Sequence, residues 1–180
     1  MRILRDNAIA MVIDIQERLF PHIDRHDQIE KNCAILIKGL QQLGIPMIVT
    51  EQYPKGLGPT ISPLKALLSE TPPVEKMTFS CCGVTGVTDR LAHSGRRQVI
   101  VFGIEAHVCV LQTTLDLLDL GYQPAVIADC ISSRKPDDKR TAVQRMRQAG
   151  AIVSSFESIL FELCRTAGTE EFKAISRLVK

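Results

Sequence analysis

Residues 8–15 read AIAMVIDI, and this stretch decides the fold class of the chain. The residues before Asp14 are apolar on both alternating faces, which is typical of a central strand in a parallel sheet. Further β-branched runs follow along the chain, and segments with helical periodicity separate them. The alternation predicts an α/β fold, a three-layer α/β/α sandwich whose helices cover both faces of a doubly wound, Rossmann-like sheet of six parallel strands.

The expected elements cover most of the chain. The expected strands are residues 8–15, 45–50, 73–76, 98–104, 123–128 and 151–154. The expected helices are residues 27–43, 62–69, 88–93, 108–120, 136–148, 157–164 and 170–178. Asp27 and Glu30 are placed as a capping box for the first helix, and Gly44 as its stop. Two glycines and two prolines predict an irregular loop at residues 51–60, long enough to be functional.

Composition limits the class of protein. A length of 180 residues suits one domain over residues 1–180, and 45% hydrophobic residues can fill its core. The net charge of +2, with interleaved signs and only 4% aromatic residues, argues against a nucleic-acid partner. No apolar run reaches the length of a membrane span, and no leader is recognisable, so we expect a cytoplasmic protein. The six cysteines include no C-x-x-C pair and are expected to be reduced thiols.

Three polar residues mark the candidate site. Ligands of open parallel sheets bind beyond the carboxyl ends of the strands. Asp14 follows the first strand, Lys76 ends residues 73–76, and Cys109 lies in the first turn of the expected helix 108–120. A helix N-terminus favours an anion, so its position predicts a lowered pKa for the Cys109 thiol.

Taken together, the thiol, the carboxylate and the ammonium form a self-consistent nucleophilic site. The carboxylate of Asp14 takes the thiol proton and passes it to a leaving amine, while Lys76 stabilises the negative charges. Each residue alone has a more ordinary explanation: an acid that caps a helix, a lysine in solvent, a cysteine in an apolar core. His107, two residues before Cys109, is the rival base, and a Cys–His pair is the second hypothesis.

The three residues lie in the segments VIDIQERL, EKMTFS and FGIEAHVCV. Together with TEQYPKGLG at 50–58 and ADCISSR at 128–134, these segments resemble the isochorismatase-like cysteine hydrolase family. The resemblance covers nearly the whole chain and is strongest to the branch called isochorismatase domain-containing proteins. It implies the sheet order 3-2-1-4-5-6, with the site between strands 1 and 4. It also implies a homo-oligomer, a dimer or larger.

The resemblance further implies a cis bond between Ile104 and Glu105. By analogy this bond aims the N–H of Glu105, with that of Cys109, into an oxyanion hole. The implied reaction is attack of the Cys109 thiolate on a small amide, ureide or carbamoyl compound. Ammonia or an amine leaves, and water hydrolyses the thioester.

The chain also departs from the family pattern. Leu19, with Phe20 beside it, stands where many members carry an aromatic residue, and Ala106 stands where many carry threonine. Having Cys109 argues for amide chemistry, because vinyl-ether hydrolysis of isochorismate needs no thiol. An isochorismatase-type ether hydrolase and a catalytically weak binding protein stay open as alternatives.

A metal site is not expected. Nicotinamidases of the family bind a metal through an aspartate and two histidines after the second strand. This chain has Glu51, Gln52 and Tyr53 there and no histidine between His26 and His93. We therefore expect no metal and no cofactor, and nicotinamide becomes a less suitable substrate.

The wall of the substrate pocket is assigned to residues near the trio. Gln16 is on the same face as Asp14 by strand alternation. The full set of candidates is Gln16, Leu19, Phe20, Tyr53, Phe79, Ser80 and His107. Core packing or an exposed turn explains several of them equally well.

Overall fold

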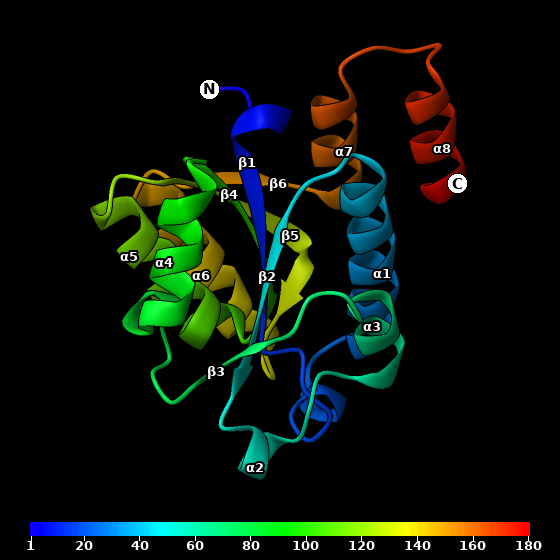
Figure 1. Ribbon diagram of the computed structural model, residues 1–180. Helices are drawn as coiled ribbons and strands as arrows, with labels where there is room; N and C mark the ends of the chain where they lie inside the picture. The colour runs from blue at the N-terminus through cyan, green and yellow to red at the C-terminus, as the bar shows by residue number, and fades with distance from the viewer.

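The computed structural model describes residues 1–180, and its six parallel strands form one sheet in the order β3-β2-β1-β4-β5-β6 (Figure 1). The strands are β1 (Ala8–Ile13), β2 (Met47–Gln52), β3 (Val74–Lys76), β4 (Gln98–Ile104), β5 (Gln123–Ser132) and β6 (Ile152–Ser154). Strand β1 pairs with β2 on one side and with β4 on the other. The α/β class that the sequence pattern predicts and the sheet order that the family resemblance implies are both confirmed.

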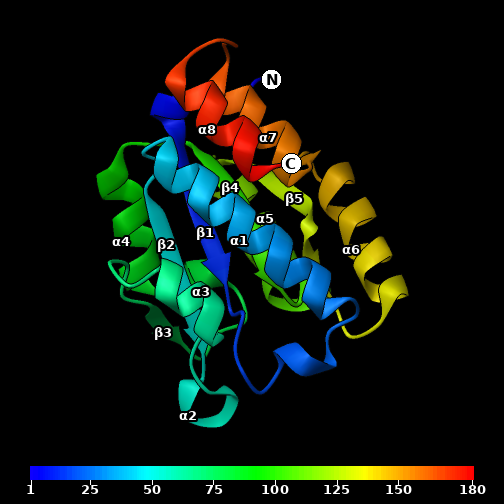
Figure 2. The ribbon, with the colours of Figure 1, turned by 90° about the vertical axis from the view of Figure 1, so that its right-hand side faces the viewer.

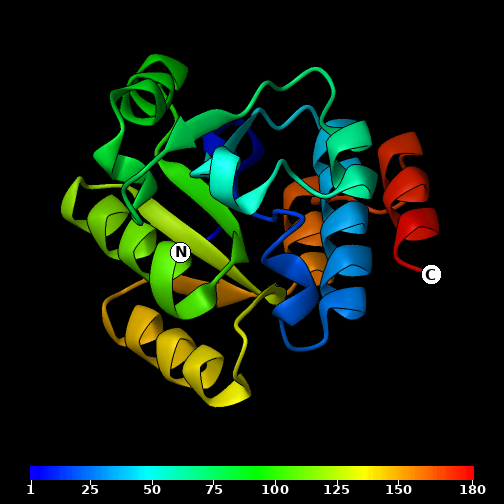
Figure 3. The same ribbon diagram turned by 90° about the horizontal axis from the view of Figure 1, so that it is seen from below.

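Helices cover both faces of this sheet. They are α1 (His26–Gln42), α2 (Pro54–Leu57), α3 (Ser62–Leu67), α4 (Thr85–Ser94), α5 (Leu111–Asp119), α6 (Pro136–Gln148), α7 (Phe156–Cys164) and α8 (Glu170–Leu178). Helices α1, α3, α7 and α8 lie on one face, which Figure 2 shows from the front, and α4, α5 and α6 lie on the other (Figure 3). None of these helices is both long and apolar enough to cross a membrane.

The centre of the sheet is packed tightly enough to require a glycine. All residues of β1 and β4 are buried. Gly103 in β4 has φ +128°, and a Cβ there would lie 2.1 Å from the carbonyl oxygen of Ile13. Only glycine combines this backbone conformation with such a close approach. The glycine therefore brings the end of β4 against the end of β1, where the candidate site begins.

The first strand and the first helix differ from the prediction at their ends. Strand β1 ends at Ile13, because Asp14 takes a left-handed conformation with φ 51°. Helix α1 begins at His26 after a left-handed Arg25, without a side-chain cap. The predicted capping box is therefore wrong, and Asp27 is already inside the first turn.

The segment 51–60 is more regular than predicted. Strand β2 continues to Gln52, and Pro54–Leu57 forms the single turn of α2. Proline suits the first position of a helix, where its missing N–H costs no hydrogen bond. Gly58, with φ 77°, ends the turn. Prolines and glycines here delimit a short helix instead of preventing one.

The predicted helix 108–120 consists of two pieces. Residues Ala106–Val110 form a π-helical turn, and α5 begins only at Leu111. Such turns are rare and occur frequently at functional sites. The turn carries Cys109 and directly follows β4.

Candidate active site

A small cavity lies at the carboxyl ends of the central strands. Its volume is about 100 Å³. Its wall is formed by Asp14, Leu19, Gln52, Leu57, Phe79, Ile104, Glu105, Val108 and Cys109. This is the edge of the sheet at which α/β proteins bind ligands. No three His, Cys, Asp or Glu side chains in the chain come together as a metal-binding group.

Asp14 reaches this cavity because its backbone turns sharply after β1. Its left-handed conformation is uncommon outside glycine, asparagine and aspartate. The side chain is 1% exposed, and its Oδ1 accepts a hydrogen bond from Thr50 Oγ1 at 2.8 Å. Oδ2 lies 2.6 Å from Lys76 Nζ but receives no well-directed hydrogen bond. This oxygen can therefore accept a proton from a neighbouring group.

Lys76 is the last residue of β3, and its side chain is completely buried. Its Nζ donates to Gln52 Oε1 at 2.8 Å and to the carbonyl oxygens of Phe79 and Thr78 at 3.0 and 3.2 Å. Burial tends to lower the pKa of Lys76, but the negative charge of Asp14 beside it leads the effects that raise the pKa above its ordinary value. The lysine is thus a permanent buried cation facing the aspartate.

Cys109 is held as a protonated thiol. Burial raises its pKa most, the charge of Asp14 raises it further, and the charge of Lys76 only partly opposes them. The lowered pKa predicted from a helix N-terminus is therefore wrong. The residue is in a buried π-helical turn beside a carboxylate, and both desolvation and the negative charge of Asp14 disfavour the thiolate. A base must remove the proton before the sulfur can attack.

The turn that carries Cys109 is fastened to the end of β5. The peptide bond between Ile104 and Glu105 is cis. The Glu105 side chain is buried, and its Oε2 accepts hydrogen bonds from both N and Nε of Arg134 at 3.0 Å. His107 Nδ1 lies 2.9 Å from Ser133 Oγ. Two consecutive residues after β5 thus hold both sides of the turn.

Two of the predicted pocket residues line the cavity, and a third, the sequence neighbour of one of them, does not. Leu19 and Phe79 belong to its wall. Phe20 is buried in a short 3-10 helix with its ring edge against His26, so its assignment to the pocket is wrong. The amides of Leu19 and Phe20 both donate to the Gln16 carbonyl oxygen, and only Leu19 belongs to the cavity wall.

Gln16 has a structural role instead of a substrate contact. Its Nε2 donates to the carbonyl oxygens of Gln52 and Gly58 at 3.0 and 2.6 Å. Its Oε1 accepts from the Gln52 amide at 2.7 Å. The prediction from strand alternation fails because β1 ends before Gln16. The side chain ties the chain after β1 to the segment after β2.

Ser80 and His107 do not belong to the cavity wall either. Ser80 Oγ accepts a hydrogen bond from the Cys82 amide at 3.2 Å. His107 Nε2 lies 3.8 Å from Asp138 in α6, and its other ring nitrogen faces Ser133. These contacts argue against the Cys–His hypothesis, because both ring nitrogens already face groups other than Cys109.

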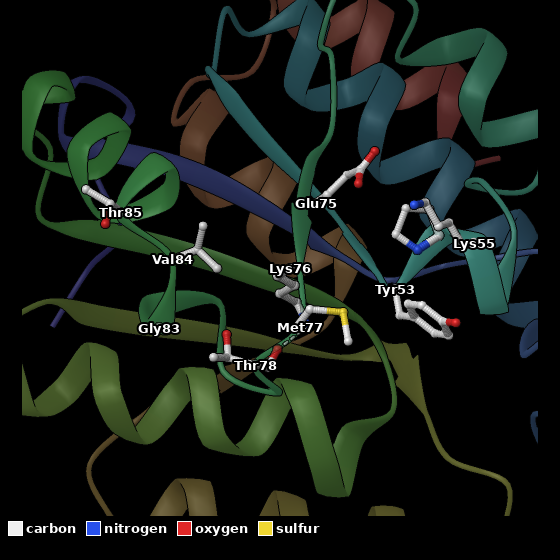
Figure 4. Close-up of a pocket in the computed structure, with 10 residues that line it drawn as sticks. Tyr53, Lys55, Glu75, Lys76, Met77, Thr78, Gly83, Val84 and Thr85 are labelled. Carbon is white, nitrogen blue, oxygen red and sulfur yellow. Dashed lines mark hydrogen bonds between the residues drawn. The ribbon is translucent and has the colours of Figure 1, made fainter.

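Tyr53 lies at a second and larger cavity of about 600 Å³ beside β3, an edge strand of the sheet. Figure 4 shows its wall: Tyr53, Lys55, Glu75, Lys76, Met77, Thr78, Gly83, Val84 and Thr85. Neither Asp14 nor Cys109 reaches it. Lys76 contributes to this wall but directs its ammonium to the opposite side, toward Asp14. The placement of Tyr53 at the substrate is therefore not supported by the geometry.

Several residues that hold the trio were not predicted from the sequence. Thr50 and Gln52 alternate at the carboxyl end of β2, and each binds one member of the ion pair. Polar residues two apart at the end of a parallel strand were the signal for them. Cys81 is fully buried with its Sγ 3.6 Å from Thr50 Oγ1. Burial first, and then the charge of Asp14, raise the pKa of Cys81 to about 11.

Comparison with known proteins finds relatives in sequence and in structure. A family model described as isochorismatase domain matches residues 8–158. Isochorismatase domain-containing protein 2A of Mus musculus is 39% identical over 180 residues, covering 99% of this chain and 85% of that protein. The solved structure of MAR1 ribonuclease from Caenorhabditis elegans has 40% identity and a TM-score of 0.94, covering 99% of this chain and 92% of that one. The YcaC gene product of Escherichia coli, described as an octameric hydrolase of unknown specificity, shares the fold, with a TM-score of 0.88, 23% identity and coverage of 92% and 83%.

Proposed function

The chain belongs to the isochorismatase family, and from that membership we propose that it is a metal-independent cysteine hydrolase that cleaves a carbon–nitrogen bond of a small molecule. One observation carries the proposal. Asp14 and Cys109, from the ends of two adjacent strands, line the same cavity, and Lys76 Nζ lies 2.6 Å from the carboxylate. A base, a nucleophile and a fixed cation are the parts that acyl transfer through a thiol requires.

The first step is attack of Cys109 on the carbonyl carbon of the substrate. Because the thiol is protonated, Asp14 takes its proton as the sulfur–carbon bond forms. The negative charge that develops on the carbonyl oxygen is stabilised by the N–H groups of Glu105 and Cys109, which we assign as the oxyanion hole. Asp14 then gives the proton to the substrate nitrogen, and the carbon–nitrogen bond breaks. Ammonia or an amine departs, and a thioester remains on Cys109.

The second step is hydrolysis of that thioester. Asp14, again a carboxylate, takes a proton from water as the oxygen attacks the acyl carbon. The carbon–sulfur bond breaks, and the proton returns to the Cys109 sulfur. The released product is a carboxylic acid. Lys76 holds Asp14 in place through both steps by its buried charge.

The test is acyl transfer to hydroxylamine. A thioester formed from an amide is captured as a hydroxamic acid, and ammonia is released in the same assay. We expect wild type and Cys164→Ala, which alters a thiol outside the cavity, to form hydroxamate. Cys109→Ala should form none. Ammonia release that survives Cys109→Ala would overturn the proposal.

An isochorismatase-type ether hydrolase remains the alternative from the family. Cleavage of a vinyl ether needs no thiol, so isochorismate hydrolysis should survive Cys109→Ala while amide hydrolysis does not. Comparison of the wild type with Cys109→Ala therefore distinguishes the two reactions. Product formation from isochorismate with both proteins, and ammonia with neither, would favour the ether hydrolase.

RNA cleavage is a second candidate because a relative at 40% identity is described as a ribonuclease. The geometry supports it less than acyl transfer. The cavity wall carries two carboxylates, Asp14 and Glu105, and no arginine or lysine that could bind a phosphate. Incubation with single-stranded RNA is the check. RNA cleavage that Cys109→Ala and Asp14→Asn both abolish would place this reaction first.

Self-association is part of the same proposal. The Escherichia coli relative is described as octameric. In this chain Tyr53, Met77 and Phe79 are 47%, 70% and 54% exposed, and they surround the two cavities near β3. We expect light scattering to give a multiple of the monomer mass, and Met77→Asp to lower it. A monomer at all concentrations would refute this part.

A further inference from the structure

The size of the catalytic cavity restricts what can be cleaved in it. Its volume is about 100 Å³, whereas pockets for drug-sized ligands start at roughly 300 Å³. A water molecule takes roughly 30 Å³ in the liquid, so the cavity has room for about three water molecules. Covalently bonded atoms lie closer together than separate water molecules, so a substrate of on the order of five non-hydrogen atoms fills the same volume. Three of those atoms belong to the amide group itself. The rest of the substrate is therefore a few atoms long.

The wall of the cavity also restricts the chemistry of the substrate. Its surface away from the trio is apolar: Leu19, Leu57, Phe79, Ile104 and Val108. Gln52 has the one uncharged polar side chain besides the thiol, and both ends of its amide are already bound, to Lys76 Nζ and to the Met77 carbonyl. The second N–H of the Gln52 amide is then the one uncharged side-chain donor besides the thiol that the wall offers to a hydroxyl, ring nitrogen or second amide of a substrate.

The charges of the cavity are already balanced in pairs. Asp14 is paired with Lys76, and Glu105 with Arg134. The Lys76 ammonium also donates to three oxygens, and the cavity wall contains no other cation. A carboxylate on the substrate would lose its hydration and lie near the Asp14 carboxylate without a cation of its own.

We infer that the substrate is an uncharged primary amide with a short aliphatic acyl group, of the size of propionamide to isobutyramide. This inference rests on the proposed function, because it assumes that Cys109 attacks an amide. Cysteine attack on the carbonyl carbon breaks its bond to nitrogen and releases ammonia, and water then releases a short-chain carboxylic acid. The apolar wall accepts the alkyl group, and the trio accepts the amide.

The experiment compares amides that differ in length and in charge, with ammonia release as the readout. We expect kcat/KM to rise by about fourfold for each added methylene from acetamide to butyramide, because each buries apolar surface. Hexanamide should fall at least tenfold below butyramide. Oxamate and isobutyramide have the same number of non-hydrogen atoms, and oxamate should be at least a hundredfold poorer.

Two variants test the wall directly. Leu57→Ala enlarges the cavity and should raise kcat/KM for hexanamide relative to propionamide at least tenfold. Leu120→Ala removes a leucine that is half exposed outside the cavity, and should leave the ratio unchanged. Thermal unfolding of both variants checks that they are folded.

The outcomes separate this inference from the proposed function. If the wild type cleaves oxamate or hexanamide faster than isobutyramide, the inference of a short, uncharged substrate is overturned. The proposal of Cys109-dependent hydrolysis is not affected by that result. An unchanged length preference in a folded Leu57→Ala variant would overturn the role of the wall. Absence of Cys109-dependent ammonia and hydroxamate from every amide would overturn both.

Discussion

Lys76 Nζ lies 2.6 Å from Asp14 Oδ2, and this ion pair spans the strand between them. Asp14 follows β1 and Lys76 ends β3, while β2 is located between these two strands. Strand β2 supplies a partner to each side: Thr50 donates to Asp14, and Gln52 accepts from Lys76. The charges are therefore held by the sheet itself, before any substrate arrives.

Removal of the Lys76 cation should lower the free energy of unfolding, because the buried carboxylate of Asp14 loses its partner. Lys76→Met leaves the Asp14 carboxylate buried without its partner, which lowers the free energy of unfolding by about 3 to 5 kcal/mol. Combining it with Asp14→Asn removes the unpaired charge and should recover a large part of that loss. Urea unfolding of the two single variants and the double variant measures this. A double variant no more stable than Lys76→Met would contradict the interpretation.

The hydroxyl of Thr50 should contribute to the stability of the fold through its hydrogen bond to Asp14. It donates to a buried carboxylate, and hydrogen bonds to charged groups contribute about 1.5 to 3 kcal/mol. Thr50→Val keeps the shape of the side chain but loses the donor, so it should lower stability by this amount and lower kcat. Thr50→Ser keeps the donor and should retain most of both. Equal losses in the two variants would refute the role of the hydrogen bond.

Arg134 is a positioning residue for the turn that carries Cys109. Its N and Nε both bind the buried Glu105 carboxylate. Arg134→Gln removes the guanidinium charge and the Nε donor of the side chain, and a small displacement of the catalytic turn should lower kcat by about tenfold to a hundredfold with little change in KM. Arg140→Gln, which alters an exposed arginine paired only with Asp137, is the control. A rise in KM at unchanged kcat would indicate that Arg134 binds substrate instead.

Buried thiols should make the protein less stable in alkali. The pKa of Cys81 is raised to about 11 in the folded state, so the folded protein keeps a proton that the unfolded chain releases above its ordinary pKa near 9. The stabilisation is complete below about pH 9 and is lost as the pH rises to about 11, at about 1.4 kcal/mol per pH unit.

Urea unfolding of wild type and Cys81→Ala between pH 8 and 11 measures this effect. The stability difference between the two proteins should shrink by about 2 kcal/mol over that range. Val87→Ala, a buried substitution that removes no titrating group, should show a constant difference. A constant difference for Cys81→Ala as well would show that the thiol ionises equally in both states.

Gly103 should be one of the least replaceable residues of the sheet. A Cβ there would lie 2.1 Å from the Ile13 carbonyl oxygen, and the residue has φ +128°. Gly103→Ala should therefore separate β4 from β1 and lower the free energy of unfolding by about 3 kcal/mol or more. Gly86→Ala in helix α4 meets only ordinary contact and should raise stability by about 0.5 to 1 kcal/mol. Chemical denaturation compares the two.

The order of elements could be predicted because it is encoded locally. Apolar runs such as β4 and periodic segments such as α6 matched their predicted bounds, since each depends on neighbouring residues alone. Element ends were less predictable. The ends at Asp14 and Arg25 depend on left-handed backbone conformations that neither composition nor periodicity indicates.

The sequence by itself determined the parallel α/β sheet, the family and the identity of Asp14, Lys76 and Cys109 as the residues to examine. Tertiary structure alone decided which side chains face the cavity, which carbonyls hold the lysine, and that the thiol is protonated. The physical reason is that side-chain direction follows from each backbone turn, and a pKa sums burial and charge from strands distant in sequence. Only packing brings those contributions to one place.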